Sequence, residues 1–120
     1  MKTNQLRKFI KSQLDSVLTS YFKEAPDNAM FPHCVFDFKD INISDLSRDD
    51  YMLEVDLWGK DQEFEVQGFA DQICEKFNFA NLPNDETLPT FFRDARKNVP
   101  DDNKTINHIY IRFLVETYDQ

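Results

Sequence analysis

The chain has 120 residues and a formal net charge of −8, from 22 acidic and 14 basic side chains. This length predicts one domain over residues 1–120, because typical domains contain about 100–150 residues. The negative field disfavours specific binding to nucleic acid phosphates. The sequence contains no apolar run as long as a membrane span, so we expect no export signal, no membrane partner and folding in a reducing cytoplasm.

The first predicted element is an amphipathic helix over about residues 4–21. Its apolar side chains recur at three- and four-residue steps and form one stripe: Leu6, Phe9, Ile10, Leu14, Val17, Leu18 and Tyr21. Thr3 or Asn4 can cap its start, and Pro26 stops the chain from continuing as a helix. Such a helix is long enough to cross one face of a sheet.

A turn over residues 24–29 leads to a predicted strand over 31–38, with Cys34, Phe36 and Phe38 on one face. Adjacent side chains on a strand point to opposite faces, so His33 is expected on the rim of the other face. The following residues, 39–50, predict a polar connector.

A second strand is predicted over Tyr51–Trp58, where apolar and polar residues alternate. One face carries the core candidates Tyr51, Leu53, Val55 and Leu57, and the other carries Met52, Glu54, Asp56 and Trp58. This alternation is typical of an antiparallel sheet with one face in water.

Asp61 is the predicted N-cap of a second helix, and Glu63 and Glu65 stand in its first turn, where the helix dipole favours acids. The helix is expected to end at about residues 78–81, before a loop over 82–89. Its apolar stripe consists of Val66, Phe69, Ala70, Ile73 and Phe77, which Phe64 or Cys74 can widen.

The last third predicts a β-hairpin with strands over about 90–97 and 105–118, joined by a turn over 98–104. The final strand is partly apolar on both faces, so we expect it at the centre of the sheet or against a neighbour. The element order α-β-β-α-β-β predicts an α+β two-layer sandwich, in which two helices cover a mostly antiparallel four-stranded sheet.

Residues with catalytic or metal-binding chemistry are few. His33 and Cys34 are adjacent, but on a strand they point apart and do not form a nucleophile and base pair. Zinc sites usually use short paired ligand spacings, which His33, Cys34, Cys74 and His108 lack. The two glycines, Gly59 and Gly68, do not form a phosphate-binding loop. The sequence therefore predicts no cofactor, no metal and no enzymatic activity.

Glu54 and Asp56 share a strand face, as a general acid–base pair would require. Their alternative role is the solvated half of an alternating strand. Met52 and Trp58 lie on the same face, and aromatics mixed with charges are common in protein interfaces. This face is therefore either a contact surface or an ordinary exposed sheet face. The hairpin turn has two similar interpretations: an arm that adds to a neighbouring sheet, or a simple surface hairpin.

With these elements placed, the chain resembles the tail-terminator family of long-tailed bacteriophages and prophages. The resemblance spans nearly the whole chain and depends on the order and spacing of several segments. They are the N-terminal helix, the Tyr21–Ala29 turn leading to Phe31-Pro32, the strand ending at Phe38, the Leu53–Trp58 strand, the helix with an acidic start, and Arg96–Asp102 before the last strand.

The resemblance implies a protomer that closes into a ring, usually of six copies, which caps the finished tail tube. Its implied partners are itself, the tail-tube protein and a head-completion or connector protein, in the virion tail and in the host bacterial cytoplasm during assembly. At −8 per copy, such a ring would repel any DNA passing through it. Pro26, Asp27 and Asn28 match the family in position, as do Val99, Pro100 and Asp101, and we expect both turns at ring contacts.

The sequence leaves three hypotheses open, each for a different class of function. The first is the ring-forming terminator, which needs a heterologous interface whose rotation closes; another head–tail connector component is its near relative. The second is a monomeric acidic module that occupies a basic site on a partner protein. The third is a small enzyme using Glu54, Asp56 or a histidine.

Overall fold

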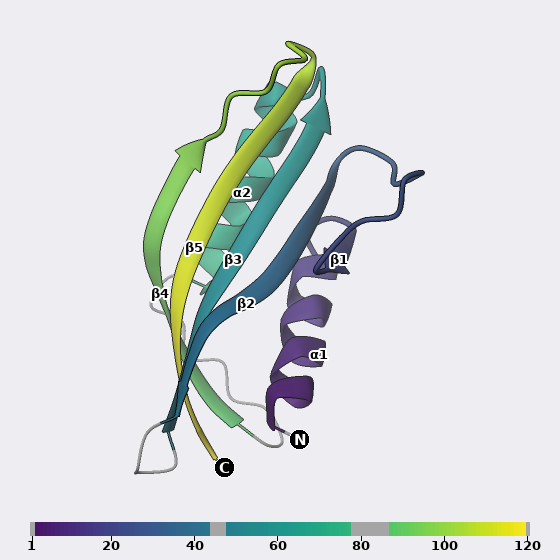
Figure 1. Cartoon of the computed structure of the whole chain (residues 1–120). Coiled ribbons are helices and arrows are strands. Elements are labelled where there is room, and N and C mark those ends of the chain that lie inside the picture. Colours follow the sequence, from purple (N-terminus) through teal and green to yellow (C-terminus); the bar gives the residue numbers. More distant parts are fainter. Residues whose placement is uncertain (1, 44–47, 78–86, 120) are drawn as a thin grey trace.

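The computed structural model describes residues 2–43, 48–77 and 87–119. Its elements are α1 (Lys2–Asp15), β1 (Ser20–Phe22), β2 (His33–Ile43), β3 (Arg48–Lys60), α2 (Glu63–Phe77), β4 (Thr87–Asn98) and β5 (Ile106–Asp119). The strands form one five-stranded sheet in the order β1-β2-β3-β5-β4, and both helices cover the same face of it (Figure 1). The predicted α+β two-layer class is confirmed, whereas the prediction of four strands is wrong.

The fifth strand, β1, comes from residues that the apolar stripe assigns to the first helix. α1 ends at Asp15, and the Leu14 carbonyl accepts hydrogen bonds from both Val17 N (2.8 Å) and Leu18 N (3.0 Å). Asp15 Oδ1 then accepts from Ser20 N (3.1 Å) and Ser20 Oγ (2.6 Å). An aspartate that binds nearby backbone in this way competes with helix continuation. The chain turns instead, and β1 pairs in parallel with β2, which makes the sheet mixed.

The predicted polar connector over 39–50 is also wrong where the structure describes it. β2 continues to Ile43 and β3 begins at Arg48, with Asn42 opposite Asp50; residues 44–47 lie outside the described residues. Strand pairing is made by backbone groups, so it extends here through residues too polar to give a strand signal. The strands reach beyond α2 at this end (Figure 1), and the molecule measures 47 × 25 × 23 Å.

The N-cap of the second helix lies one residue later than predicted, and α2 begins at Glu63. Asp61 adopts a left-handed backbone with φ 52°, and its N–H donates to the Thr105 carbonyl (2.8 Å). The first helical hydrogen bond runs from Val66 N to the Gln62 carbonyl (2.9 Å), so Gln62 holds the N-cap position. The predicted end of this helix at 78–81 lies outside the described residues, as do residues 82–86 of the predicted loop.

The hairpin prediction is confirmed, although both strands are longer than expected. β5 pairs with β3 on one side and with β4 on the other, so the partly apolar final strand is central, as its pattern predicts. β4 begins at Thr87, and its register with β5 shifts between Arg93 and Ala95.

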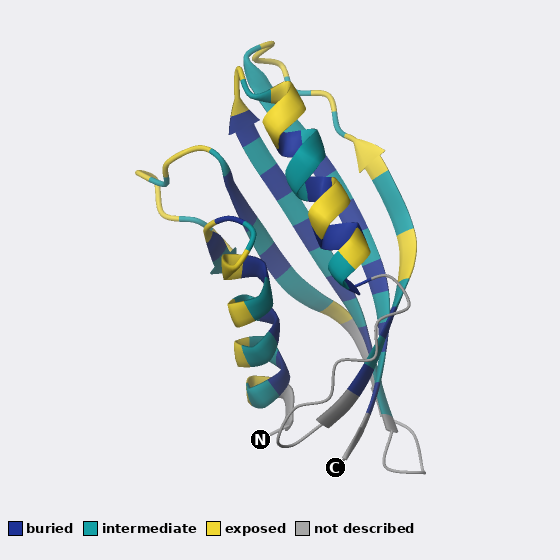
Figure 2. Cartoon of the chain, turned by 180° about the vertical axis from the view of Figure 1, so that it is seen from behind, coloured by how far each residue is buried: buried dark blue, intermediate teal, exposed yellow. Residues whose placement is uncertain are grey.

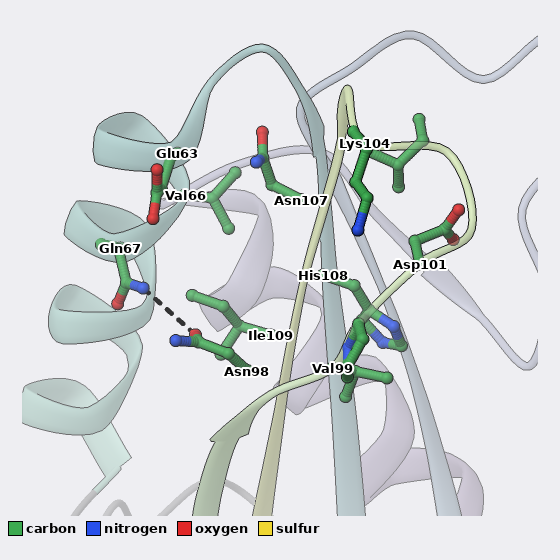
Figure 3. A pocket seen from close by; sticks show the side chains of 12 residues that line it. Glu63, Val66, Gln67, Asn98, Val99, Asp101, Lys104, Asn107, His108 and Ile109 are labelled. Atoms are coloured by element: carbon green, nitrogen blue, oxygen red, sulfur yellow. Dashed lines mark hydrogen bonds between the residues drawn. The ribbon is translucent and has the colours of Figure 1, made fainter.

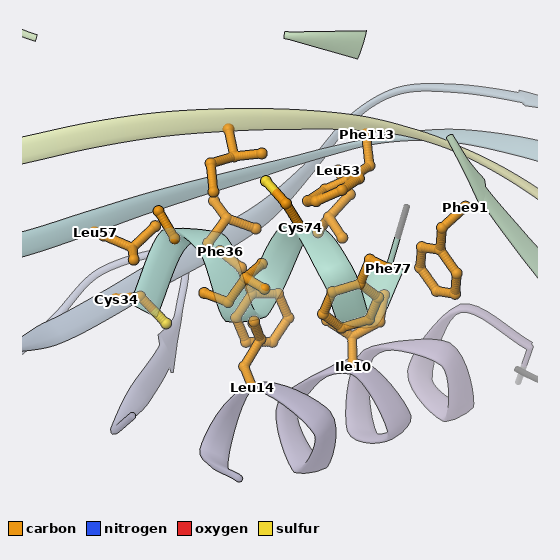
Figure 4. Packing of buried hydrophobic residues seen from close by; sticks show 14 of the residues in the cluster. Ile10, Leu14, Cys34, Phe36, Leu53, Leu57, Cys74, Phe77, Phe91 and Phe113 are labelled. Carbon is orange, nitrogen blue, oxygen red and sulfur yellow. The ribbon is translucent and has the colours of Figure 1, made fainter. Parts of the chain in front are cut away.

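The core lies between the helices and the sheet (Figure 2; Figure 4). Phe77 of α2 packs against Phe91 of β4 and Phe113 of β5, with ring centroids 4.9 and 5.7 Å apart. The predicted core residues of the 51–58 strand are buried, and Cys74 widens the helix stripe, whereas Phe64 is 87% exposed. The fully buried large side chains are Tyr51, Phe36, Phe77, Phe91, Phe113, Leu6, Ile10, Leu14, Leu53, Leu57, Ile73 and Ile111.

Candidate functional site

The sheet face opposite the helices carries the predicted contact residues. Along β3, the side chains of Met52, Glu54, Asp56 and Trp58 alternate with the buried core residues and keep intermediate exposure. The predicted division of this strand into two faces is therefore confirmed. On β5, His108, Tyr110 and Arg112 share the same open face, because Trp58, Asp56 and Glu54 are their register partners.

Each carboxylate of the predicted acid–base pair has a partner on β5. His108 stacks on Trp58 with centroids 3.7 Å apart, and its Nε2 lies 2.6 Å from Asp56 Oδ1. The Tyr110 hydroxyl donates a hydrogen bond to the Glu54 carboxylate. Burial and that carboxylate raise the pKa of Tyr110 to about 12, so the phenol stays a donor at neutral pH. These cross-strand pairs fix the side chains in a set pattern.

The pattern extends to the edge strand β4. Lys97 Nζ lies 5.5 Å from the centre of the Tyr110 ring, and Arg112 Nε donates to Asp94 Oδ2 at 2.6 Å. The hydrogen bond to Asp94 raises the pKa of Arg112 above its ordinary value. Because these groups are exposed, we treat them as surface organisation and not as a source of stability.

The two predicted turns lie at one end of the sheet. Pro26, Asp27 and Asn28 are exposed in the loop that precedes β2, and Val99, Pro100 and Asp101 form the turn after β4. His33, the first residue of β2, pairs with Trp58, which pairs with His108. Val99 N in turn donates to the His108 carbonyl at 2.9 Å. The register thus brings both turns to the end of the sheet that carries the Trp58–His108 stack.

His33 is buried, at 6% exposure, and not on the rim as predicted. Tyr21 meets its ring edge-on at 5.8 Å, and Phe31 lies 5.2 Å away. Its neighbour Cys34 is fully buried on the opposite face, as expected, and burial raises the pKa of its thiol to about 12. Within the described residues, no three His, Cys, Asp or Glu side chains gather as metal ligands would.

Burial lowers the pKa of His33 below its ordinary 6.5, although the hydrogen bond to the Met30 carbonyl opposes this effect. The unfolded chain therefore binds a proton at a higher pH than the folded protein does. The contribution of neutral His33 to the unfolding free energy is therefore complete above pH 6.5, and it decreases as the pH is lowered below that value. We expect the urea concentration at the unfolding midpoint to decrease as the pH is lowered from about 7 to about 5.5. In the His33→Gln variant this dependence of the midpoint on pH should be weaker. An unchanged slope in that variant would contradict the assignment.

A pocket of about 220 Å³ lies beside the β4–β5 turn (Figure 3). The first turns of α2 form one wall through Glu63, Val66 and Gln67, and the hairpin forms the other. A hydrogen bond joins the two walls, since Gln67 Nε2 donates to Asn98 Oδ1 at 3.1 Å. Sequence reasoning found only the turn residues of this pocket, because the pairing of a helix face with a distant turn leaves no local signal.

α2 is tied to β4 next to this pocket. Arg96 Nη1 lies 2.8 Å from Asp71 Oδ1, and Arg96 Nη2 donates to Gln67 Oε1 at 3.0 Å. Burial would lower the pKa of Arg96, but the hydrogen bonds and charge interactions with Asp71 and Cys74 together outweigh it, so the net change is upward. This link holds the helix wall of the pocket in place over the edge strand β4.

Neither described helix is long and apolar enough to cross a membrane.

No protein-family model matches this chain, and no curated protein matches it in sequence. Among solved structures, the chain is similar to a protein chain in the virion of a native gene transfer agent particle. The TM-score is 0.62 at 9% identity, over 89% of this chain and 84% of the other. At this identity the likeness is one of fold, and it extends over nearly the whole α+β unit.

Proposed function

We propose that this protein is a non-catalytic structural component of a phage-like particle, of the tail-terminator kind. The observation that carries the proposal is the fold it shares, over 89% of its length, with a protein chain of a gene transfer agent virion. The order of sequence segments that resembles tail terminators supports the same role. In this role, copies of the chain close into a ring, cap the tail tube and present a surface to a head-side protein.

The open sheet face suits such a role better than it suits catalysis. Glu54 and Asp56 are each held by a β5 side chain, so the face presents a fixed arrangement of aromatic, apolar and charged groups. The predicted contact residues Met52 and Trp58 lie within it. A preorganised surface of this kind reduces the ordering cost of association.

Ring formation is tested by absolute mass from light scattering after size exclusion. We expect a discrete species near six protomers that is favoured at high salt, because salt screens the repulsion between copies of charge −8. Continuous growth in mass with concentration would indicate an open filament. A strict monomer under all conditions would leave only template-dependent assembly, which the next experiment measures.

Capping is tested with the tail-tube protein of the same particle. Adding this protein to polymerising tubes should shorten and narrow the distribution of tube lengths seen by electron microscopy. Met52→Glu, on the open face, should weaken assembly or capping, whereas Gln72→Glu, on an exposed position of α2, should not. Tubes that grow unchanged in the presence of a folded protein would overturn the proposed function and favour a monomeric acidic module.

A further inference from the structure

The loop between β1 and β2 presents an apolar protrusion. Met30 is 82% exposed and its neighbour Phe31 is 38% exposed, although both are large hydrophobic side chains. Buried His33 holds this protrusion in place: as its Nδ1–H tautomer it donates to the Met30 carbonyl at 3.1 Å, and its ring packs on Phe31. Met30 and Phe31 together form a small contiguous apolar patch, and contiguous apolar patches are the surfaces that proteins use for contact.

The pocket beside the β4–β5 turn can accept such a group. Its walls include the apolar side chains of Val66, Val99, Pro100, Ile106 and Ile109. Its volume of about 220 Å³ is below the ~300–1,000 Å³ of pockets that hold drug-sized ligands. It therefore matches one or two protein side chains better than a cofactor or metabolite.

Parts of β2 and β4 that lie along the two sides of the sheet are poorly suited to joining copies by strand addition. Cys34 N and the Phe36 carbonyl form hydrogen bonds on the side of β2 that faces β1. Backbone groups of every second residue point to the same side of a strand, so Phe38 N also points to that side. Asp37 Oδ1 accepts the hydrogen bond of Phe38 N at 2.8 Å. On the opposite edge, β4 contains Pro89, which has no N–H, and the register shift between Arg93 and Ala95. Such features blunt edge strands, which favours contact through loops and pockets.

One charged side chain at the pocket and one in the loop are opposite in sign, and neither has an ion-pair partner within the described residues. Lys104 on the pocket rim forms no ion pair within the described part of the chain, and neither do Glu24 and Asp27 in the loop. The rim acids are already compensated: Asp101 accepts from Asn103 N at 2.8 Å, and Glu63 stands in the first turn of α2, where the helix dipole stabilises it. The loop also contains Lys23, whose ammonium lies over the Phe22 ring, so the complementary pair is Lys104 at the pocket and Asp27 in the loop.

The two features lie toward opposite edges of the sheet. The loop leaves at β2, whereas the pocket lies between α2 and the hairpin of β4 and β5 (Figure 1). We propose that Met30 and Phe31 of one copy insert into the pocket of the next copy, with Lys104 facing Asp27. This inference rests on the proposed ring and identifies its contact. The contact is heterologous, so repetition of it generates a ring when the rotation closes.

The first test compares two acid substitutions by light scattering of the whole protein. Met30→Asp should weaken self-association by at least about tenfold, because it puts a charge against the apolar side chains of Val66, Val99 and Ile109 in place of a hydrophobic contact. Phe64→Asp is the matched control, since Phe64 is 87% exposed but does not line the pocket, and it should leave association unchanged. Circular dichroism confirms that both variants are folded.

A charge exchange and a crosslink test the geometry directly. Lys104→Glu should weaken association, and adding Asp27→Lys to it should restore most of the loss. Mixing single variants Met30→Cys and Lys104→Cys under oxidation should give a disulfide dimer faster than either variant alone, which also tests the contact if Met30→Asp fails to fold.

The outcomes separate this contact from the proposed function. A discrete oligomer that tolerates Met30→Asp and gives no preferential crosslink overturns the contact and leaves the ring intact. A protein that neither associates nor caps tubes overturns both. Equal weakening by Met30→Asp and Phe64→Asp, with no rescue by charge exchange, also rejects the pocket as the receiving site.

Discussion

Phe77→Ala is expected to lower the free energy of unfolding by about 3–5 kcal/mol. Phe77 is fully buried at the last turn of α2, where its ring packs against Phe91 of β4 and Phe113 of β5. Its removal takes away the hydrophobic transfer energy and two aromatic contacts, and it leaves a cavity that three elements surround. Chemical denaturation followed by circular dichroism measures the change, with midpoint and slope analysed separately.

Phe64→Ala is the matched control for this prediction, since it removes the same side chain from the same helix at a position that is 87% exposed. The expected change is within about 0.5 kcal/mol. A Phe77→Ala variant as stable as the Phe64→Ala variant would contradict the packing of α2 onto β4 and β5.

Gly59→Ala is expected to destabilise the fold by about 1–3 kcal/mol. A Cβ at Gly59 would lie 2.4 Å from Val66 Cγ2 and 3.3 Å from Gln62 Cβ. Val66 is buried, at 1% exposure, and a β-branched side chain in a helix has essentially one favoured rotamer. The clash is therefore relieved only by moving α2 away from the end of β3. Thermal and urea unfolding of the variant measure the loss.

Gly68→Ala provides the opposite control within the same helix. A Cβ there meets nothing within 4 Å, and alanine is favoured over glycine in a helix interior by about 0.5–1 kcal/mol. Gly68→Ala should therefore stabilise the protein. If both alanine variants changed stability in the same direction, the close approach of α2 to Gly59 would be contradicted.

The sequence predicts the apolar parts of the fold well. The alternation along Tyr51–Trp58 and the stripe of α2 correctly indicate which side chains are buried, because burial demands a period that sequence displays directly. The elements that it misses have other causes. β1 depends on Asp15 binding Ser20, and the ends of β2 and β3 depend on backbone pairing between polar segments.

The candidate site shows the same division. The open face of β3 is predictable, because it is the remainder once the core residues are assigned. The partners of Glu54 and Asp56 are not, because Tyr110 and His108 lie more than fifty positions along the chain. The burial of His33 likewise depends on Tyr21 and Phe31 converging on it, and the pocket depends on α2 meeting a turn that its own sequence does not specify.

The position of β5 has a consequence for synthesis on the ribosome. It follows every other described strand in the chain, yet it occupies the place between β3 and β4. β2 and β3 can pair as soon as they emerge, but β4 has no neighbour until the strand after it is made. A nascent chain halted before residue 106 therefore exposes the inner edge of β3 and an unpaired β4, and chaperones that bind unpaired strands would meet it in that interval.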